Sequence, residues 1–200
     1  MKSSPNFSQK TNLPNLKSFS TDVGLEAANL AVQIYGGHGY IKDHGMEQLL
    51  RDSRIAPIYE GTNGIQALDL IGLKLTRDGG HMLEATYGAF NALVAAIEDA
   101  QSKATAQAIL DEWKVSSTEC LGMDATTAAS AACDYLAYSA YSLIGVLWYS
   151  MADTAQRSDN AVLAASKAKS RDFFELNQFI IFFTSPVTSG PIPSPASRRI

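Results

Sequence analysis

Cysteine is scarce in this sequence: two cysteines in 200 residues exclude a disulfide-dense scaffold. Cys120 and Cys133 are thirteen positions apart. At about 100° per helical residue, this spacing places them on nearly opposite faces of one helix. A disulfide between them is therefore not expected, and two reduced thiols in a cytoplasmic protein fit the pattern best.

An excess of positive charge is also lacking. Sixteen basic residues stand against twenty acidic ones, and the formal net charge of −4 argues against nucleic acid or an anionic membrane surface as a partner. Near the N-terminus, Lys2 is not followed by an apolar run, so we expect no secretory signal.

No segment alternates apolar and polar residues as a half-buried strand does, which favours an all-α fold. Residues 135–152 form an uncharged run of eighteen positions, the shortest length that spans a membrane. The serine and tyrosine hydroxyls in this run are costly inside a bilayer. We therefore expect a helix buried within a helical bundle and no membrane span.

The helical period is clear from residue 21, because Val23, Ala27, Leu30 and Ile34 fall on one stripe of a helix that Gly36 would end. The same reasoning predicts a short helical segment and several longer helices. They cover residues 46–52, 63–75, 82–97, 104–113, 124–151 and 160–183.

These boundaries divide the chain into four parts. Residues 1–20 are expected to form a poorly ordered leader that becomes helical near Leu16. Residues 21–75 form a first helical unit, and residues 76–183 form an additional helical domain. Residues 184–200 are rich in proline and serine, which predicts an extended or disordered tail.

Glu60 is the most informative polar residue, since it lies on a predicted loop after Pro57 and directly before a helix. A carboxylate enclosed by Ile58, Tyr59 and a ligand would have a raised pKa and could act as a general base near neutral pH. The alternative is a solvated loop acid, or an acid favoured by the positive end of the helix dipole.

The segment Gly61-Thr62-Asn63-Gly64 places free amide groups, a hydroxyl and two glycines at a helix start, an arrangement suited to binding an anion. Simple capping by Thr62 or Asn63 explains the same residues without a ligand. Asn63 and Gln66 also stand at the spacing of a capping box.

The segment from Gln33 to Tyr40 contains three glycines but lacks the glycine spacing and the preceding strand of a dinucleotide-binding fingerprint. Its glycines either end a helix in a turn or leave backbone open to a ligand. The nearby side chains His38, Asp43, His44 and Glu47 match no established metal-ligand spacing, so no metal site is expected. Arg51, Asp52 and Arg54 are expected to hold the following loop by ion pairs.

Several segments, in their order and spacing, together resemble the acyl-CoA dehydrogenase family. They are Ala31-Val32-Gln33-x-x-Gly36-Gly37-x-Gly39-Tyr40, Arg51-Asp52-x-Arg54-Ile55, Ile58-Tyr59-Glu60-Gly61-Thr62 and Ile65-Gln66. The specific resemblance covers about residues 21–80. A looser similarity through about Phe174 points to the longer branch that includes methylmercaptopropionyl-CoA dehydrogenases. Residues 21–75 would then be part of the family's C-terminal helical domain.

The resemblance implies FAD-dependent α,β-dehydrogenation of an acyl-CoA thioester in fatty acid metabolism, with electrons passed to an electron-transfer acceptor. Glu60 would be the catalytic base that removes the α-proton. Thr62 would face the FAD pyrophosphate, and Tyr59 and Gly61 would line the acyl and flavin pocket. Gly64 departs from many relatives, which carry a polar side chain at this position.

The resemblance also assigns a role to the C-terminal end of the helix predicted from residue 21. There, Gln33, Gly36 and Gly37 would contact a cofactor held mainly by a neighbouring subunit. The family also has an N-terminal helical domain and a middle β-domain, which twenty residues before Thr21 cannot hold. We therefore expect a fragment, or a subunit that needs the missing dehydrogenase domains or a homo-oligomer partner. The alternative is a non-catalytic helical fragment or interaction module that binds a companion subunit.

Overall fold

The computed structural model describes residues 7–184, and every regular element in this range is helical, which confirms the all-α expectation. The predicted tail at 185–200 lies outside the described residues. In chain order the elements are α1 (Phe7–Tyr35), α2 (Gly37–Tyr40), the short 3-10 helix η1 (Lys42–His44), α3 (Met46–Arg54), α4 (Asn63–Leu68), the π-helix η2 (Asp69–Thr76), α5 (His81–Ala95), α6 (Ala100–Leu121), α7 (Ala125–Gln156) and α8 (Ala161–Thr184).

The first helix is longer than its periodicity indicates. α1 begins at Phe7 and contains Pro14, so the expectation of a poorly ordered leader is wrong for residues 7–20. An internal proline removes a backbone hydrogen bond and costs about 3 kcal/mol. Burial offsets this cost here: Pro14 is fully buried, and the neighbouring Asn15 donates through Nδ2 to Ser139 Oγ at 3.1 Å.

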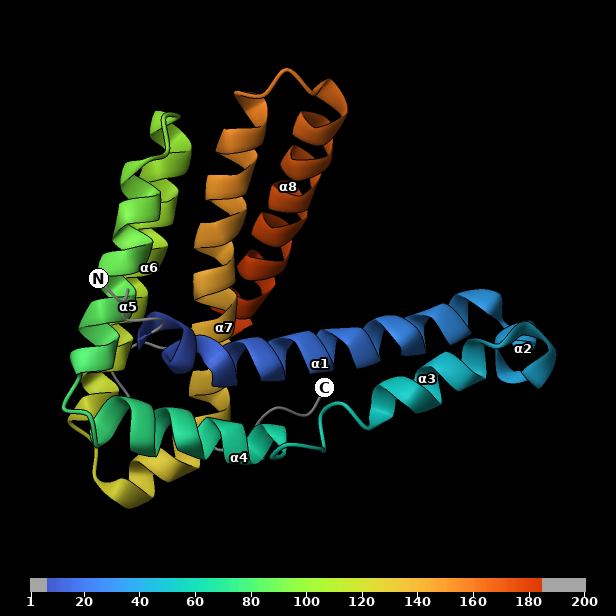
Figure 1. Cartoon of the computed structure of the whole chain (residues 1–200), viewed down its shortest axis with the longest axis horizontal. Coiled ribbons are helices and arrows are strands. Elements are labelled where there is room, and N and C mark those ends of the chain that lie inside the picture. Colours follow the sequence, from blue (N-terminus) through green and yellow to red (C-terminus); the bar gives the residue numbers. More distant parts are fainter. Residues whose placement is uncertain (1–6, 185–200) are drawn as a thin grey trace, which may run out of the picture. The chain divides into compact units, whose positions relative to one another are not determined.

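The chain forms two compact units, which do not follow the boundary expected at residue 75. The first unit comprises residues 1–89 and 112–140. Within it, α3 and α4 run back alongside α1, and η2 also packs against α1 (Figure 1). Its interior contains buried side chains from η2, α5, α6 and α7. They include Leu70, Ile71, Leu75, Leu83, Trp113, Ala131 and Tyr135.

The predicted helix over 63–75 is divided in two, because α4 gives way to π-helical backbone at Asp69. The Thr76 hydroxyl donates to the Ile71 carbonyl at 2.7 Å, and the Arg77 amide donates to the Gly72 carbonyl at 3.1 Å. The backbone bond from Arg77 to Gly72 spans five residues, as π-helical turns do, and the Thr76 hydroxyl satisfies a further carbonyl of the segment. The adjacent residues Leu70 and Ile71 are both buried in this segment.

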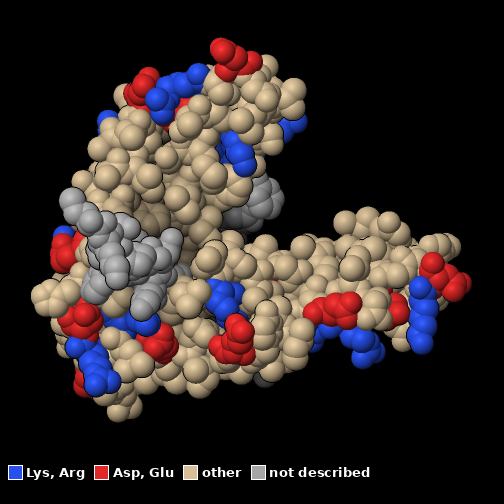
Figure 2. Space-filling model, in the orientation of Figure 1, with Lys and Arg blue, Asp and Glu red and all other residues tan. Residues whose placement is uncertain are grey.

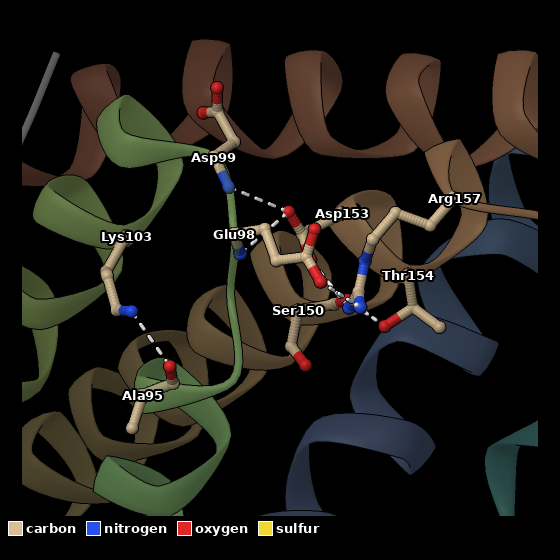
Figure 3. Close-up of polar contacts among 8 residues, drawn as sticks. All are labelled: Ala95, Glu98, Asp99, Lys103, Ser150, Asp153, Thr154 and Arg157. Carbon is tan, nitrogen blue, oxygen red and sulfur yellow. Dashed lines mark hydrogen bonds and ion pairs between the residues drawn. The ribbon is translucent and has the colours of Figure 1, made fainter.

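The second unit comprises residues 90–111 and 141–200. Its described core includes Val94, Ile97, Leu110, Val146 and Phe174. Asp153 of α7 is buried and binds the backbone of the link that leads into α6 (Figure 3).

Two surface properties bear on function. No helix in the described part of the chain has the length and hydrophobicity required to cross a membrane. On the face seen in Figure 2, charged side chains form small groups of both signs with uncharged surface between them. No large basic or acidic patch is visible on that face.

Candidate functional site

The loop between α3 and α4 presents Glu60 on an unusual backbone. Glu60 has a φ of 54°, and it is the one described residue other than glycine with a positive φ. Gly61 follows with a φ of 86°. A Cβ on Gly61 would also lie 3.1 Å from Gln66 Nε2, so both conformation and space favour glycine there. Two successive left-handed residues thus form the bend at which Glu60 is exposed.

Side chains hold both carbonyl groups of this bend. Gln66 Nε2 donates to the Glu60 carbonyl at 3.0 Å, and Lys17 Nζ donates to the Gly61 carbonyl at 2.9 Å. Pro57 at the start of the loop is buried, whereas Tyr59 is 52% exposed. Hydrogen bonds from Gln66 and Lys17 therefore hold the backbone of the bend, while the Glu60 and Tyr59 side chains are exposed to solvent.

Thr62 is the N-cap of α4, which settles the choice between Thr62 and Asn63. Its Oγ1 accepts a hydrogen bond from the Ile65 amide at 3.3 Å, as an N-cap hydroxyl does. The capping box predicted from Asn63 and Gln66 is wrong, because the Gln66 side chain turns to the Glu60 carbonyl instead. An accepting hydroxyl keeps its own proton, so Thr62 can still donate one hydrogen bond to a ligand.

The second predicted group lies at the C-terminal end of α1. Gln33, Gly36 and Gly37 are all exposed, and Gly36 ends the helix with a φ of 59°. A Cβ on Gly37 would meet no atom within 4 Å, whereas a Cβ on Gly39 would overlap the backbone of Val32. Packing thus explains the glycine at position 39 but not at position 37, where bare backbone stays open to a partner.

The structure does not bring the two groups together into one pocket within this chain. α3, with nine residues, separates the Gly36–Gly37 turn from the Glu60 loop, and nine residues of α-helix measure about 14 Å. No hydrogen bond, ion pair or ring contact joins the two groups among the described residues. Among the described residues the two groups are therefore separate features of this chain.

The remaining expectations at this end of the molecule concern metals and ion pairs. The rings of His38 and His44 lie 4.9 Å apart, edge to face. Within residues 7–184 no cluster of three or more His, Cys, Asp or Glu side chains is arranged to hold a metal ion. Asp52 accepts from Gln48 Nε2 at 2.7 Å, and none of the ion pairs among the described residues involves Arg51, Asp52 or Arg54, so the ion pairs expected to hold the loop are not found there.

Sequence reasoning missed the residue that holds the loop. Lys17 lies 44 positions before Gly61, inside the segment expected to be a leader, and no local pattern connects the two. The local sequence explains Asn63 only as a helix cap, whereas its side chain bonds to Lys17 and Asp22 of α1. Only the packing of α1 against α4 reveals these contacts.

Comparison with known proteins identifies the same family that the sequence motifs resemble. Residues 4–72 match the acyl-CoA dehydrogenase C-terminal domain. The chain is 48% identical over 96 residues to 3-methylmercaptopropionyl-CoA dehydrogenase of Ruegeria pomeroyi, a stretch that covers 48% of this chain and 16% of that relative. It is 58% identical over 52 residues to an acyl-CoA dehydrogenase of Bacillus subtilis, covering 26% of this chain and 14% of the relative.

A third relative, 3-(aryl)acrylate reductase of Clostridium sporogenes, is 46% identical over 52 residues, again covering 26% and 14% of the two chains. The chain thus spans about a sixth or less of the length of these relatives. The matched region begins well before residue 21, in agreement with the early start of α1. Residues 4–72 are therefore similar to the C-terminal domain of acyl-CoA dehydrogenases, and the similarity supports the interpretation of this segment as a part of such a domain.

Proposed function

We propose that this chain supplies the base-bearing helical segment of an FAD-dependent acyl-CoA dehydrogenase, which oxidises the α,β-bond of an acyl-CoA thioester in the cytoplasm. The observation that carries the proposal is the exposed Glu60 carboxylate on a left-handed bend within the matched residues. A residue held in a sparsely populated backbone conformation by its surroundings is typical of active sites.

Glu60 would act as the general base. Its carboxylate accepts the α-proton of the thioester, and the fixed backbone of the bend orients the carboxylate toward the α-carbon. Tyr59 and Gly61, on either side of the base, would line the acyl and flavin pocket. FAD, when bound, would take the β-hydrogen as hydride.

The described residues fit a supporting role toward FAD. Thr62 retains a hydroxyl proton for a pyrophosphate oxygen, and the open space above Gly37 lets a ligand approach the backbone. Gln33 and Gly36 lie beside this open backbone. Because no contact joins these residues to Thr62 among the described residues, we propose that they contact cofactor bound by a neighbouring subunit or by other dehydrogenase domains. An electron-transfer acceptor would then reoxidise the flavin.

The decisive experiment transfers this segment into a complete enzyme. In the Ruegeria pomeroyi dehydrogenase, the corresponding part of the C-terminal domain is replaced by residues 4–72 of this chain. Flavin content is read from visible absorbance, and turnover from formation of the unsaturated thioester. We expect a yellow, active graft in which Glu60→Gln retains FAD but lowers kcat by about 10²–10⁴-fold.

The matched control is Glu26→Gln, because Glu26 is an exposed acid on α1 within the same graft. We expect it to leave kcat unchanged. Thr62→Val should weaken FAD binding by about 1.5–3 kcal/mol if the lost hydrogen bond is charge-assisted. A Glu60→Gln graft that turns over at the parental rate contradicts Glu60 as the base.

One observation favours a second candidate function, that of an interaction module. Large apolar side chains are exposed along α1 to α4, with Ile34 at 83% and Tyr40 at 82%. Such a surface is typical of a face that binds a partner. A graft that folds and binds a companion subunit, yet shows no turnover with Glu60 intact, would support this alternative over the catalytic one.

A further inference from the structure

The Glu60 bend is tied to α1 by a set of side-chain hydrogen bonds that the proposed chemistry does not itself require. Lys17 Nζ lies 2.9 Å from the Gly61 carbonyl oxygen and 2.8 Å from Asn63 Oδ1. Asn63 Nδ2 in turn donates to Asp22 Oδ1 at 2.7 Å and to Thr21 Oγ1 at 3.3 Å. Lys17 and Thr21 share one face of α1, since they are four positions apart, and Asp22 follows Thr21 directly in the same helix.

The chemistry of these groups leaves only one arrangement. The Lys17 ammonium has donors and no acceptor, so the amide oxygen of Asn63 must face it. The Asp22 carboxylate only accepts, so the amide nitrogen of Asn63 must face Asp22. Asn63 is therefore oriented from both sides, and Lys17 spans from Asn63 to the Gly61 carbonyl. We name these residues, Lys17, Asn63, Thr21 and Asp22, the α1 clamp.

The clamp acts on a strained backbone. Glutamate at a φ of 54° lies in a region that side-chain-bearing residues seldom adopt, and it stays there only if its surroundings hold it. Gln66 holds the Glu60 carbonyl from within α4, and Lys17 holds the next carbonyl from α1. Without Lys17, the Glu60–Gly61 segment can rotate toward a more populated conformation, which would turn the Glu60 side chain away.

We propose that Lys17, oriented through Asn63, is a positioning residue that fixes the direction in which Glu60 is presented. The proposal rests on Glu60 being the base. It assigns Lys17 no contact with substrate or cofactor. Its effect passes through the backbone of Gly61 and should therefore alter the chemical step more than the binding of the thioester.

The first test uses the full 200-residue chain and NMR. Lys17→Met keeps the apolar part of the side chain but removes the donors, while Lys42→Met, on exposed η1, is the matched control. Two readouts report on the loop. One is the intraresidue amide-to-Hα cross-peak of Glu60, which is strong only at positive φ. The other is hydrogen exchange of the Asn63 amide, which donates to the Pro57 carbonyl at 3.2 Å.

We expect Lys17→Met to weaken the Glu60 cross-peak and to speed exchange at Asn63 by about 10- to 100-fold, while exchange in the core of α6 is unchanged. Lys17→Arg should restore much of the protection, because a guanidinium can also donate to two acceptors. A cross-peak and exchange rate equal to those of the parent overturn the proposal. Equal acceleration at Asn63 and in α6 also overturns it, because Lys17 would then act only on global stability.

The second test separates positioning from binding in the active graft. Lys17→Met should lower kcat by about 10-fold or more with little change in KM, since a small misplacement of a reacting group slows chemistry. A raised KM with unchanged kcat overturns the positioning role. If Glu60→Gln leaves turnover intact, the proposed function fails instead, and the NMR result still decides whether Lys17 holds the bend.

Discussion

Removing the Asp153 carboxylate should lower the free energy of unfolding of the second unit. The loss should be larger than the loss from breaking any single ion pair on the surface of that unit. Asp153 is 5% exposed, and its Oδ1 accepts from the Glu98 amide at 3.1 Å and from the Asp99 amide at 3.0 Å (Figure 3). Its Oδ2 accepts from Arg157 at 2.9 Å. One side chain thus satisfies two backbone donors immediately before α6.

The size of the effect follows from these bonds. An amide left without its acceptor costs about 1–3 kcal/mol, and both amides are partly accessible to water, so Asp153→Ala should cost about 2–3 kcal/mol. Arg157 is 43% exposed, so its ion pair adds less than about 1 kcal/mol. Asp153→Asn keeps an acceptor but loses the charge, which roughly halves the strength of each bond and predicts a cost of about 1–1.5 kcal/mol.

Urea unfolding followed by circular dichroism measures these values, and hydrogen exchange at Glu98 and Asp99 locates the effect. Asp134→Ala is the matched control, because Asp134 is exposed on the same helix, α7. The expected order of cost is Asp153→Ala, then Asp153→Asn, then Arg157→Ala. The reasoning is refuted if Asp153→Ala costs no more than the control, or if Asp153→Asn is as harmful as Asp153→Ala.

Three further predictions concern the interior. Ser139→Ala removes the acceptor of Trp113 Nε1 and of a buried asparagine amide, and should lower the unfolding free energy by about 2–4 kcal/mol in urea. Gly145→Ala should cost about 1–3 kcal/mol by the same assay, because its Cβ would overlap the Phe174 ring. Burial and the Glu119 charge raise the pKa of the Cys120 thiol from 9.0 to about 11, so a thiol reagent at pH 8 should modify only exposed Cys133 until the protein unfolds.

The first two of these predictions have controls elsewhere in the helices. Ser142 is buried, and its hydroxyl has no partner among the described residues, so Ser142→Ala should be neutral or slightly stabilising. Gly88→Ala meets no atom within 4 Å and should stabilise α5 by up to about 1 kcal/mol. If either control costs as much as its counterpart, the packing argument fails.

The raised pKa of the Cys120 thiol also sets a pH dependence. Above about pH 9 the thiol ionises in the unfolded chain but stays protonated in the folded one until about pH 11. Its contribution to stability is therefore complete below pH 9 and is lost as the pH rises toward 11. A Cys120→Ala variant should show a smaller loss of stability over this range. An identical loss in both proteins would contradict the assignment.

Local patterns in the sequence determined most of the helices and the place of Glu60. A helix is predicted from apolar residues every three to four positions and from glycine or proline near its ends. These signals lie within a few residues of each other. The same is true of the motif around Glu60, whose flanking proline, glycine and threonine predict a loop that enters a helix. These features are accessible from sequence because their causes are local.

Tertiary structure decided the features whose causes are distant. A proline usually ends a helix, yet α1 continues through Pro14. Burial of Pro14 and the hydrogen bond from Asn15 to Ser139 offset the backbone hydrogen bond that the proline removes. The hold of Lys17 on the Glu60 bend spans 44 positions, and the hold of Asp153 on α6 spans more than 50. A hydrogen bond between residues so far apart leaves no periodic pattern in the sequence, because only the packing of helices brings its donor and acceptor to about 3 Å.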